Sequence, residues 1–444
     1  MLVWPAWRGW CLWALGLAQV SCLVIASEQS NVLQLTGVLL AAGFAAIAFA
    51  WIAYDRQFEH LSLPFVVFIA LTLRLLALQA SPLLEDDHYR YLWDGMRMST
   101  SFDPYRQPPA FYFADAQLSA VWQAILNGIN NPHLPTIYGP TLQWLFALAY
   151  AIAPGKIGAL QGLLGAIDLV CVMVLIKARV GVRWLLIYAL HPLILKEAIA
   201  SAHPDGLLGL LLLLAFIALH RRYTFCAGIL LGAAVATKVS ALVVLALLPW
   251  FGAPVRRLAL GFIVSIALLY GPFLMNKESD FLALTVFAQS WQFNPLLFRF
   301  FEAWSNPSYA RIASGVSIVG IVFFLAWKAL RFNQAPWHYW DVALLVLLSF
   351  APVINPWYWL WALPLAMLNQ RVSVPVVGLV TTLAYANDAV LMHTPNFYVP
   401  WPITLIQVAV LVVCCAKDAA SRHATYNQTY FGAIFDPIFG PIDK

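Results

Sequence analysis

Residues 61–80 read LSLPFVVFIALTLRLLALQA, and residues 81–95 continue directly as SPLLEDDHYRYLWDG. The first stretch is apolar over about 20 residues, the length that an α-helix needs to cross the hydrocarbon core of a bilayer. The second stretch carries two adjacent carboxylates, Asp86 and Asp87, shortly after the apolar residues end. The chain therefore passes here from a membrane helix into a polar segment, and it places two acids at the edge of the bilayer.

The composition extends this interpretation to the whole chain. Hydrophobic residues make up 62% of the 444 residues and charged residues only 10%, whereas a soluble domain carries about 25% charged residues. The mean hydropathy is +0.78, and the apolar stretches have helical periodicity rather than the alternation of barrel strands. We predict an all-α integral membrane protein in contact with the lipid bilayer. The net charge of +5 is spread over short loops, so we expect no nucleic-acid partner.

The apolar stretches predict a single polytopic domain over residues 1–444, with roughly 11–14 transmembrane helices. The predicted spans are residues 10–26, 32–52, 61–80, 138–153, 157–176, 184–200, 207–219, 225–250, 258–275, 310–330, 342–353, 357–368, 374–391 and 403–415. Several are shorter than the ~20 residues of a full crossing, so some are expected to be half-helices or joined pairs. The tail after Lys417 is short and is expected to lie at the surface.

Two long segments interrupt the series of spans, residues 81–137 and residues 276–309. Both contain aromatic residues at helical spacing, which is typical of helices that lie at the membrane interface. An even number of predicted spans separates them, so we expect both on one side of the membrane, where they would meet over one cavity. The first segment is poor in Lys and Arg, as outer loops are. Simple alternation puts the basic short loops around Lys177 and Arg221 on the same side, so either that rule is weak here or part of the chain is re-entrant.

Asp86 and Asp87 suit a base at the membrane edge. General base catalysis requires a group that takes the proton of an attacking hydroxyl, and partial burial raises the pKa of a carboxylate toward the useful range. The structural alternative is an acidic cap, in which the two residues only begin the following helix.

The residues around and after the acids form an ordered series of short motifs. The series consists of Asp86-Asp87-His88-Tyr89-Arg90-Tyr91-Leu92-Trp93-Asp94-Gly95, Asp103-Pro104-Tyr105, Thr136-Ile137-Tyr138-Gly139-Pro140, His191-Pro192-Leu193-Ile194-Leu195-Lys196-Glu197, Ala202-His203-Pro204-Asp205, Trp291-Gln292-Phe293-Asn294 and Pro356-Trp357-Tyr358. In this order it resembles the GT-C superfamily of polytopic glycosyltransferases, most closely the bacterial branch of polyprenyl-phosphate-mannose-type mannosyltransferases, which is distantly similar to the GPI mannosyltransferases. Asp103 replaces the family's Asn and Gly139 replaces its Pro, departures that put the substrate in doubt more than the reaction type.

The resemblance covers about residues 80–360 and implies a GT-C-type bundle with two long outer loops. It implies an inverting glycosyltransferase that moves mannose, or a similar hexose or pentose, from a polyprenyl-phosphate donor to the hydroxyl of a glycan, lipid or protein acceptor. The expected location is the periplasmic face of a bacterial inner membrane. Asp87 matches the family's catalytic base and Asp86 is its neighbour, although the two can exchange roles. No cofactor is certain: the superfamily varies in its use of a divalent metal, and two adjacent acids without a third ligand make a weak metal site.

The candidate donor-binding residues come from charge placement and from the matched motifs. Lys238 lies inside the predicted span 225–250, where an ammonium group requires a polar partner such as a lipid phosphate. Arg74 lies in the span 61–80 and could neutralise a phosphate or pair with Glu59 or another acid. His203 and Asp205 follow an apolar span; they are candidates for orienting the donor, with a capped helix break as the structural alternative.

Three further expectations concern neighbours of these residues. Tyr89 and Arg90, from the first motif, join the donor-binding candidates. Lys196 and Glu197 are expected to form an ion pair with each other. Some interface aromatics, Trp357 and Tyr358 among them, could stack on a sugar, although most such residues are membrane anchors.

The rival interpretation is a multi-pass transporter or a flippase for lipid-linked sugars. Intramembrane charges and broken helices would serve such a protein equally well. It predicts repeated halves, which the sequence does not show, and it gives no reason for the long acidic loop after Ala80.

Overall fold

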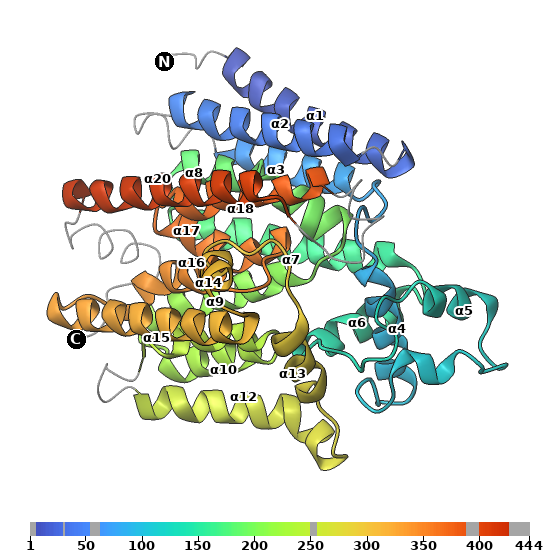
Figure 1. Ribbon diagram of the computed structural model, residues 1–444. Coiled ribbons are helices and arrows are strands. Elements are labelled where there is room, and N and C mark those ends of the chain that lie inside the picture. The colour runs from blue at the N-terminus through green and yellow to red at the C-terminus, as the bar shows by residue number, and fades with distance from the viewer. Residues whose placement is uncertain (1–5, 30–31, 54–62, 249–254, 388–398, 426–444) are drawn as a thin grey trace.

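The computed structural model describes residues 6–29, 32–53, 63–248, 255–387 and 399–425. Within these ranges the secondary structure is helical, and the β-type pairing is one isolated bridge between Phe293 and Val353. Together with the apolar helices described below, this confirms the predicted all-α integral membrane fold. Figure 1 shows the long helices running in roughly one direction as a bundle.

Five helices in the described ranges are long and apolar enough to cross a membrane. They lie within α1 (Ala6–Gln29), α7 (Ile157–Lys177), α12 (Val255–Met275), α15 (Pro307–Arg331) and α20 (Trp401–Thr425). Other apolar helices are α2 (Val32–Ala53), α3 (Leu63–Ala77), α6 (Pro140–Ile152), α10 (Thr224–Val235) and α18 (Ser373–Thr381). If the bent pair described below counts as one span, the described residues contain six. The predicted number of roughly 11–14 crossings therefore stays a prediction.

Two predicted spans are broken, which corrects the sequence analysis. The span 184–200 divides into α8 (Val182–Ala189) and a π-helix, η3 (Ile194–Ala200), which is bent by 108° relative to α9 (Asp205–His220). The span 225–250 ends as a helix at Val235 and continues through η4 (Val239–Ala241) and α11 (Leu242–Leu245). Pro192 and Pro204 lie at the first two breaks, where proline has no N–H to donate to a helix.

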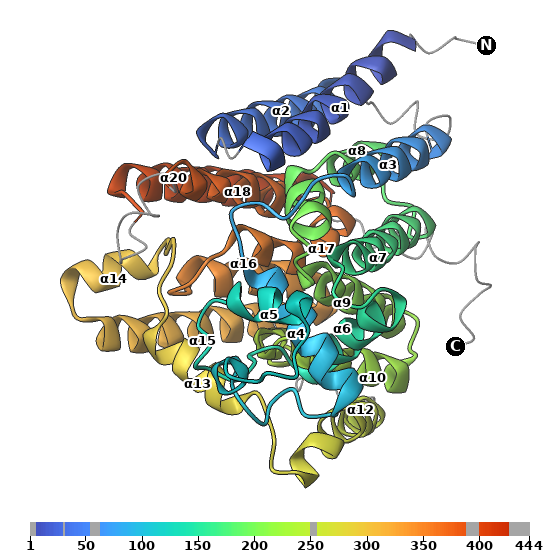
Figure 2. The same ribbon diagram turned by 90° about the vertical axis from the view of Figure 1, so that its right-hand side faces the viewer.

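The two long loops contain helices and lie at the same end of the bundle (Figure 1). The first holds α4 (Asp87–Thr100), η2 (Pro109–Tyr112) and α5 (Ala120–Asn127); the second holds α13 (Phe281–Ser290) and α14 (Phe298–Trp304). Figure 2 views this end directly, with α4, α5 and α13 toward the viewer. The first loop reaches the start of the second, because Phe102 stacks on Phe273, near the end of α12, with ring centroids 5.1 Å apart.

The centre of the bundle is made of short elements. They are α16 (Trp340–Phe350), η6 (Pro356–Trp361), α17 (Leu363–Leu368) and η7 (Thr382–Asn387), preceded by η5 (Pro336–Tyr339). All six residues of α17 are buried, whereas α15 exposes large apolar side chains such as Val316 and Val319. This pattern suits outer helices that face lipid around a protein-filled centre.

The last helix extends beyond the predicted span 403–415, because α20 continues past Lys417 to Thr425. Residues 419–421 of this helix are exposed, as expected of a tail that begins at the surface. Residues 426–444 lie outside the described part of the chain.

The close packing of α4 on α6 fixes the position of the acid pair. A Cβ atom built on Gly95 would lie 2.4 Å from the carbonyl oxygen of Phe146. Only glycine allows the two helices to approach this closely, and α4 begins at Asp87.

We therefore expect Gly95→Ala to push α4 away from α6 and to lower the unfolding free energy by about 1–3 kcal/mol. The measurement is the denaturation midpoint of the purified protein in detergent. Gly162→Ala is the matched control, because a Cβ there meets nothing within 4 Å. Equal midpoints for the two variants would show that α4 is not held by this contact.

Candidate active site

The acid pair lies at the start of α4, where Asn130 from the far end of the same loop joins the two carboxylates. The Asn130 amide donates hydrogen bonds to Asp86 and to Oδ1 of Asp87, the second at 3.1 Å. Asp86 occupies the N-cap position but makes no side-chain capping hydrogen bond. The geometry thus gives no support to the alternative in which Asp86 only caps the helix.

The surroundings of Asp86 change its acidity. Partial burial raises the pKa of Asp86 above its ordinary value, although its outer edge is exposed; the hydrogen bond from Asn130 lowers the pKa, and the charge of Asp87 raises it. Burial lowers the pKa of the adjacent His88, so this imidazole favours the neutral form. Asp86 therefore gains its proton at a higher pH than an ordinary aspartate does.

Tyr89 and Arg90 hold the loop together. The guanidinium of Arg90 donates to the carbonyl oxygen of Leu134 at 3.0 Å, and Arg90 is only 7% exposed. The ring of Tyr89 lies against Gly128, at the end of α5. Both residues brace the segment that carries Asn130, and within the described residues no hydrogen bond joins either of them to Lys238.

Asp94 and Thr136, from two of the sequence motifs, are also internal to the loop. Asp94 is 1% exposed, and it accepts hydrogen bonds from the hydroxyl of Thr136 and from the Gln143 amide, the latter at 3.1 Å. Burial raises the pKa of Asp94 to about 6. The contacts of these two motifs thus account for the loop fold rather than for substrate binding.

Lys238 and Asp205 form an ion pair of 2.7 Å between Nζ and Oδ1. The sequence predicted that Lys238 lies inside a continuous helix. In the structure Lys238 instead has extended backbone between α10 and η4. The break lets its ammonium group lie over the rings of Tyr358 and Trp361, 4.3 and 5.1 Å from the centroids. The Lys238 side chain keeps 20% exposure, whereas that of Asp205 has 1%.

Asp205 is the first residue of α9, after the 108° bend. Its Oδ1 also accepts a hydrogen bond of 2.6 Å from the Trp361 indole, and its Oδ2 is buried with no hydrogen-bond partner among the described residues. Tyr91, one helical turn after Asp87 in α4, lies 3.1 Å from His203, which is two residues before Asp205. This contact brings the start of α4 near the Asp205–Lys238 pair.

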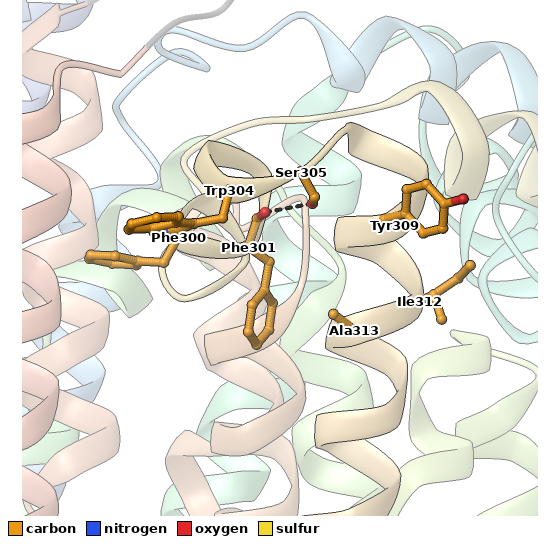
Figure 3. Close-up of a pocket in the computed structure, with 7 residues that line it drawn as sticks. All are labelled: Phe300, Phe301, Trp304, Ser305, Tyr309, Ile312 and Ala313. Carbon is orange, nitrogen blue, oxygen red and sulfur yellow. Dashed lines mark hydrogen bonds between the residues drawn. The ribbon is translucent and has the colours of Figure 1, made fainter.

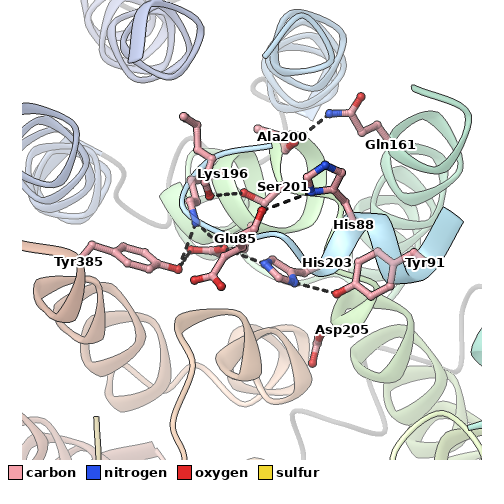
Figure 4. A network of polar contacts seen from close by, with 12 residues as sticks. Glu85, His88, Tyr91, Gln161, Lys196, Ala200, Ser201, His203, Asp205 and Tyr385 are labelled. Atoms are coloured by element: carbon pink, nitrogen blue, oxygen red, sulfur yellow. Dashed lines mark hydrogen bonds and ion pairs between the residues drawn. The ribbon is translucent and has the colours of Figure 1, made fainter. Parts of the chain in front are cut away.

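His203 lies fully buried between these elements and the interior of the bundle. Its ring stacks on Trp357, with centroids 3.8 Å apart and planes 7° apart. Its Nδ1 lies 3.1 Å from the Tyr91 hydroxyl, a contact that Figure 4 shows. The expected helix break is present, but His203 bonds across to the first loop rather than locally.

Lys196 and Glu197 form the expected ion pair, with 3.0 Å between Nζ and Oε2. Both side chains are almost completely buried. The Tyr385 hydroxyl donates to Oε1 of Glu197 at 2.7 Å. Figure 4 shows Lys196 and Tyr385 on one side of His203 and Tyr91 on the other.

Arg74 is not brought to this site by any contact of the described residues. Its Nε donates to Oδ2 of Asp168 at 2.8 Å, and the two side chains are 2% and 7% exposed. Tyr188 donates to the other oxygen of the same carboxylate, also at 2.8 Å. Of the two roles foreseen for Arg74, pairing with an acid is the observed one; Glu59, the acid named as a candidate, lies outside the described residues.

Sequence reasoning missed several residues of the site. Asn130, Tyr91 and Trp361 contact the acids or His203 but carry no local signal beyond aromatic or amide character. Tyr91 belongs to a quoted motif, but its partner is 112 residues away. Close packing explains why Gly139 stands where the family has proline. A Cβ at this position would lie 2.2 Å from the carbonyl oxygen of Ala236, the C-cap residue of α10, two residues before Lys238.

A hollow lined by none of the residues above lies between α14 and α15 (Figure 3). It has a volume of about 460 Å³ and is lined by Phe300, Phe301, Trp304, Ser305, Tyr309, Ile312 and Ala313. Its lining is mostly apolar and contains no charged side chain. Among the described residues no cluster of three His, Cys, Asp or Glu side chains is arranged to hold a metal ion.

The Arg74–Asp168 pair can be tested as a structural element. Arg74→Met leaves the Asp168 carboxylate buried without its cation, and we expect the unfolding free energy to fall by about 3–5 kcal/mol. The double variant Arg74→Met/Asp168→Leu should recover most of the loss, because no buried charge remains. Thermal unfolding in detergent measures both. A stable Arg74→Met protein that no longer binds a lipid phosphate would instead return Arg74 to the donor-binding residues.

Comparison with known proteins identifies the family. Residues 3–254 match the MptA_B family, described as alpha-(1->6)-mannopyranosyltransferase, N-terminal domain. No curated protein and no solved structure matches the chain. The match covers more than half of the chain, including the acid pair, His203, Asp205 and Lys238, and it confirms the resemblance to bacterial mannosyltransferases. The chain therefore belongs to the MptA_B family of mannosyltransferases and is a multi-pass membrane glycosyltransferase.

Proposed function

We propose that this glycosyltransferase takes a mannose, or a similar hexose or pentose, from a polyprenyl-phosphate donor and transfers it with inversion to an acceptor hydroxyl. The observation that carries the proposal is the acid pair joined by Asn130 at the membrane edge, within electrostatic range of Asp205 and its partner Lys238. A carboxylate for the hydroxyl and a cation for the phosphate are the two groups that such a transfer requires. The whole chain acts as one membrane domain in this proposal.

Asp87 is the base in this mechanism. It takes the proton of the acceptor hydroxyl while the oxygen forms a bond to C1 of the sugar, and the bond from C1 to the phosphate oxygen breaks on the opposite face. Asp87 is half-buried and heads α4, whereas Asp86 is more exposed and suits orientation of the acceptor. The single displacement accounts for inversion.

Lys238 is the group that receives the charge of the leaving phosphate. In the described structure it is paired with Asp205, with Tyr358 and Trp361 beneath it. A phosphate that approaches its exposed side would extend the ion pair into a triad, and Asp205 would hold the ammonium group in place. Direct contact with phosphate is assigned to Lys238; Asp205 and His203 position it and its surroundings.

The membrane side and the donor class rest on the loops. The first loop is acidic and poor in basic residues, which favours the periplasmic face of an inner membrane, and both loops lie at one end of the bundle (Figure 2). A donor that is itself a membrane lipid reaches this end without a nucleotide-binding domain.

The deciding experiment uses the full chain in nanodiscs with radiolabelled polyprenyl-phosphate mannose. We expect the wild type to move label from the donor to an acceptor, and Asp87→Asn to lower the rate by about 10²–10⁴-fold because the base is lost. Asp86→Asn should retain more activity than Asp87→Asn. Normal turnover by Asp87→Asn would refute the assignment of the base.

A panel of lipid-linked sugars follows if the wild type leaves the mannose donor unchanged. Transfer from another sugar would correct the donor only. Movement of the intact donor between leaflets without loss of label would instead favour the flippase alternative.

The pH dependence tests the role of Asn130. Its hydrogen bond opposes the raised pKa of Asp86, so Asn130→Ala should raise that pKa further. The acid pair would then gain a proton at a higher pH, and the acid limb of the rate profile should move to higher pH. Asn127→Ala, an exposed position of the same loop, is the control and should keep the wild-type limb. A limb that moves to lower pH in Asn130→Ala would contradict this role.

A further inference from the structure

Glu197 is a buried carboxylate that the proposed transfer does not use. It is 0% exposed and lies on η3. π-Helical segments are rare in proteins, and those that occur often lie at functional sites. Charged residues inside a membrane domain are costly and mark function more often than not. Neutralisation by Lys196 explains why the charge is tolerated, but not why it faces His203.

A row of polar groups leads from Glu197 toward the acid pair. Oε2 of Glu197 lies 3.7 Å from Nε2 of His203, which is longer than a hydrogen bond but within ion-pair distance, and Nδ1 of His203 lies 3.1 Å from the Tyr91 hydroxyl. The Tyr91 hydroxyl accepts a hydrogen bond of 3.5 Å from the Tyr138 hydroxyl. Tyr91 stands four residues after Asp87 in α4, so the two side chains lie on one face of this helix.

The direction of the protons follows from the place of the carboxylate. A carboxylate next to one ring nitrogen favours the tautomer protonated there, so Glu197 favours a neutral His203 with its proton on Nε2. In that tautomer Nδ1 accepts from the Tyr91 hydroxyl. Each tyrosine has one hydroxyl proton, so the Tyr91 oxygen can then accept from Tyr138 but not donate to it.

We propose that Glu197 is a positioning residue for the transfer reaction: through the tautomer of His203 it orients the hydroxyls of Tyr91 and Tyr138 beside Asp87. The inference rests on the proposed function for its catalytic consequence. Its structural part stands alone, because the tautomer exists without substrate. With the Tyr138 proton committed to Tyr91, the oxygen of Tyr138 offers lone pairs rather than a donor to its surroundings.

Other charged groups surround this row and also affect the protonation of His203 and Glu197. Lys196, Lys238 and His88 act on His203, and Lys196, Tyr385 and Asp205 act on Glu197. Trp357 fixes the plane of the imidazole by stacking. Rotation of the ring is therefore restricted, and the position of its proton is the remaining freedom.

The test is ¹⁵N NMR of the full chain in nanodiscs with ¹⁵N-labelled histidine, in which His203→Gln assigns the resonances of His203. The wild type should show a protonated Nε2 and an unprotonated Nδ1. In Glu197→Gln the negative charge is gone and the amide can donate to Nε2, so the proton should move to Nδ1. The double variant Glu197→Gln/Lys196→Met removes both charges of the pair and should show the same exchange if the single variant does not fold.

The control is Tyr385→Phe, which removes a hydrogen bond to the same carboxylate on the oxygen that does not face His203. It should keep the wild-type tautomer. In the transfer assay, Glu197→Gln should lower kcat by about 10- to 100-fold with little change in KM. Changes of this size are typical of residues that orient a ligand-binding side chain without touching the ligand themselves. Tyr385→Phe should stay close to the wild type.

Two results would overturn the inference: a wild-type His203 protonated on Nδ1, or a tautomer that both Glu197 variants leave unchanged. A fall in kcat without tautomer exchange also contradicts it, since Glu197 would then act by another route. A wild type without transfer activity bears on the proposed function, while the NMR result still decides whether Glu197 sets the tautomer.

Discussion

A membrane interior has no water to satisfy a polar group, and this constraint shapes the whole site. Backbone that leaves the helical ladder, and side chains that carry charge, must find partners inside the protein. This chain leaves the ladder around Pro192, around His203 and around Lys238, and each time the polar groups meet partners from distant elements. The helix breaks and the buried charges are therefore two aspects of one arrangement.

The ion pairs of Arg74 and of Lys238 meet this constraint in two different ways. Arg74 and Asp168 are both nearly inaccessible and satisfy each other with help from Tyr188. Lys238 is different: its partner Asp205 is buried, but the ammonium group remains 20% exposed above two aromatic rings. A cation held by a buried acid and open on one side is poised for an anion, whereas a completely enclosed pair is not.

The first loop connects the membrane part to the acids by close packing. Gly95 lets α4 lie against α6, Arg90 holds the carbonyl oxygen of Leu134, and Asn130 returns to the start of α4. Most of the first motif thus builds the loop, and its first two residues, Asp86 and Asp87, supply the acid pair that Asn130 joins. Family motifs in a membrane enzyme therefore include residues whose role is to place the catalytic group, and the contacts of Asp94 and Thr136 are of that kind.

The amino-acid sequence by itself determined the class of fold, the two long loops, the acid pair and the family. These features depend on composition, on local periodicity and on short motifs, which a linear chain displays directly. It also predicted the Lys196–Glu197 pair, whose partners are adjacent. Only the tertiary structure decided that Arg74 pairs with Asp168, that Lys238 lies at a break beside Asp205, and that Asn130 joins the two acids. These contacts join residues 33 to 94 positions apart, and their geometry depends on where helices break and how closely they pack, which no local pattern specifies.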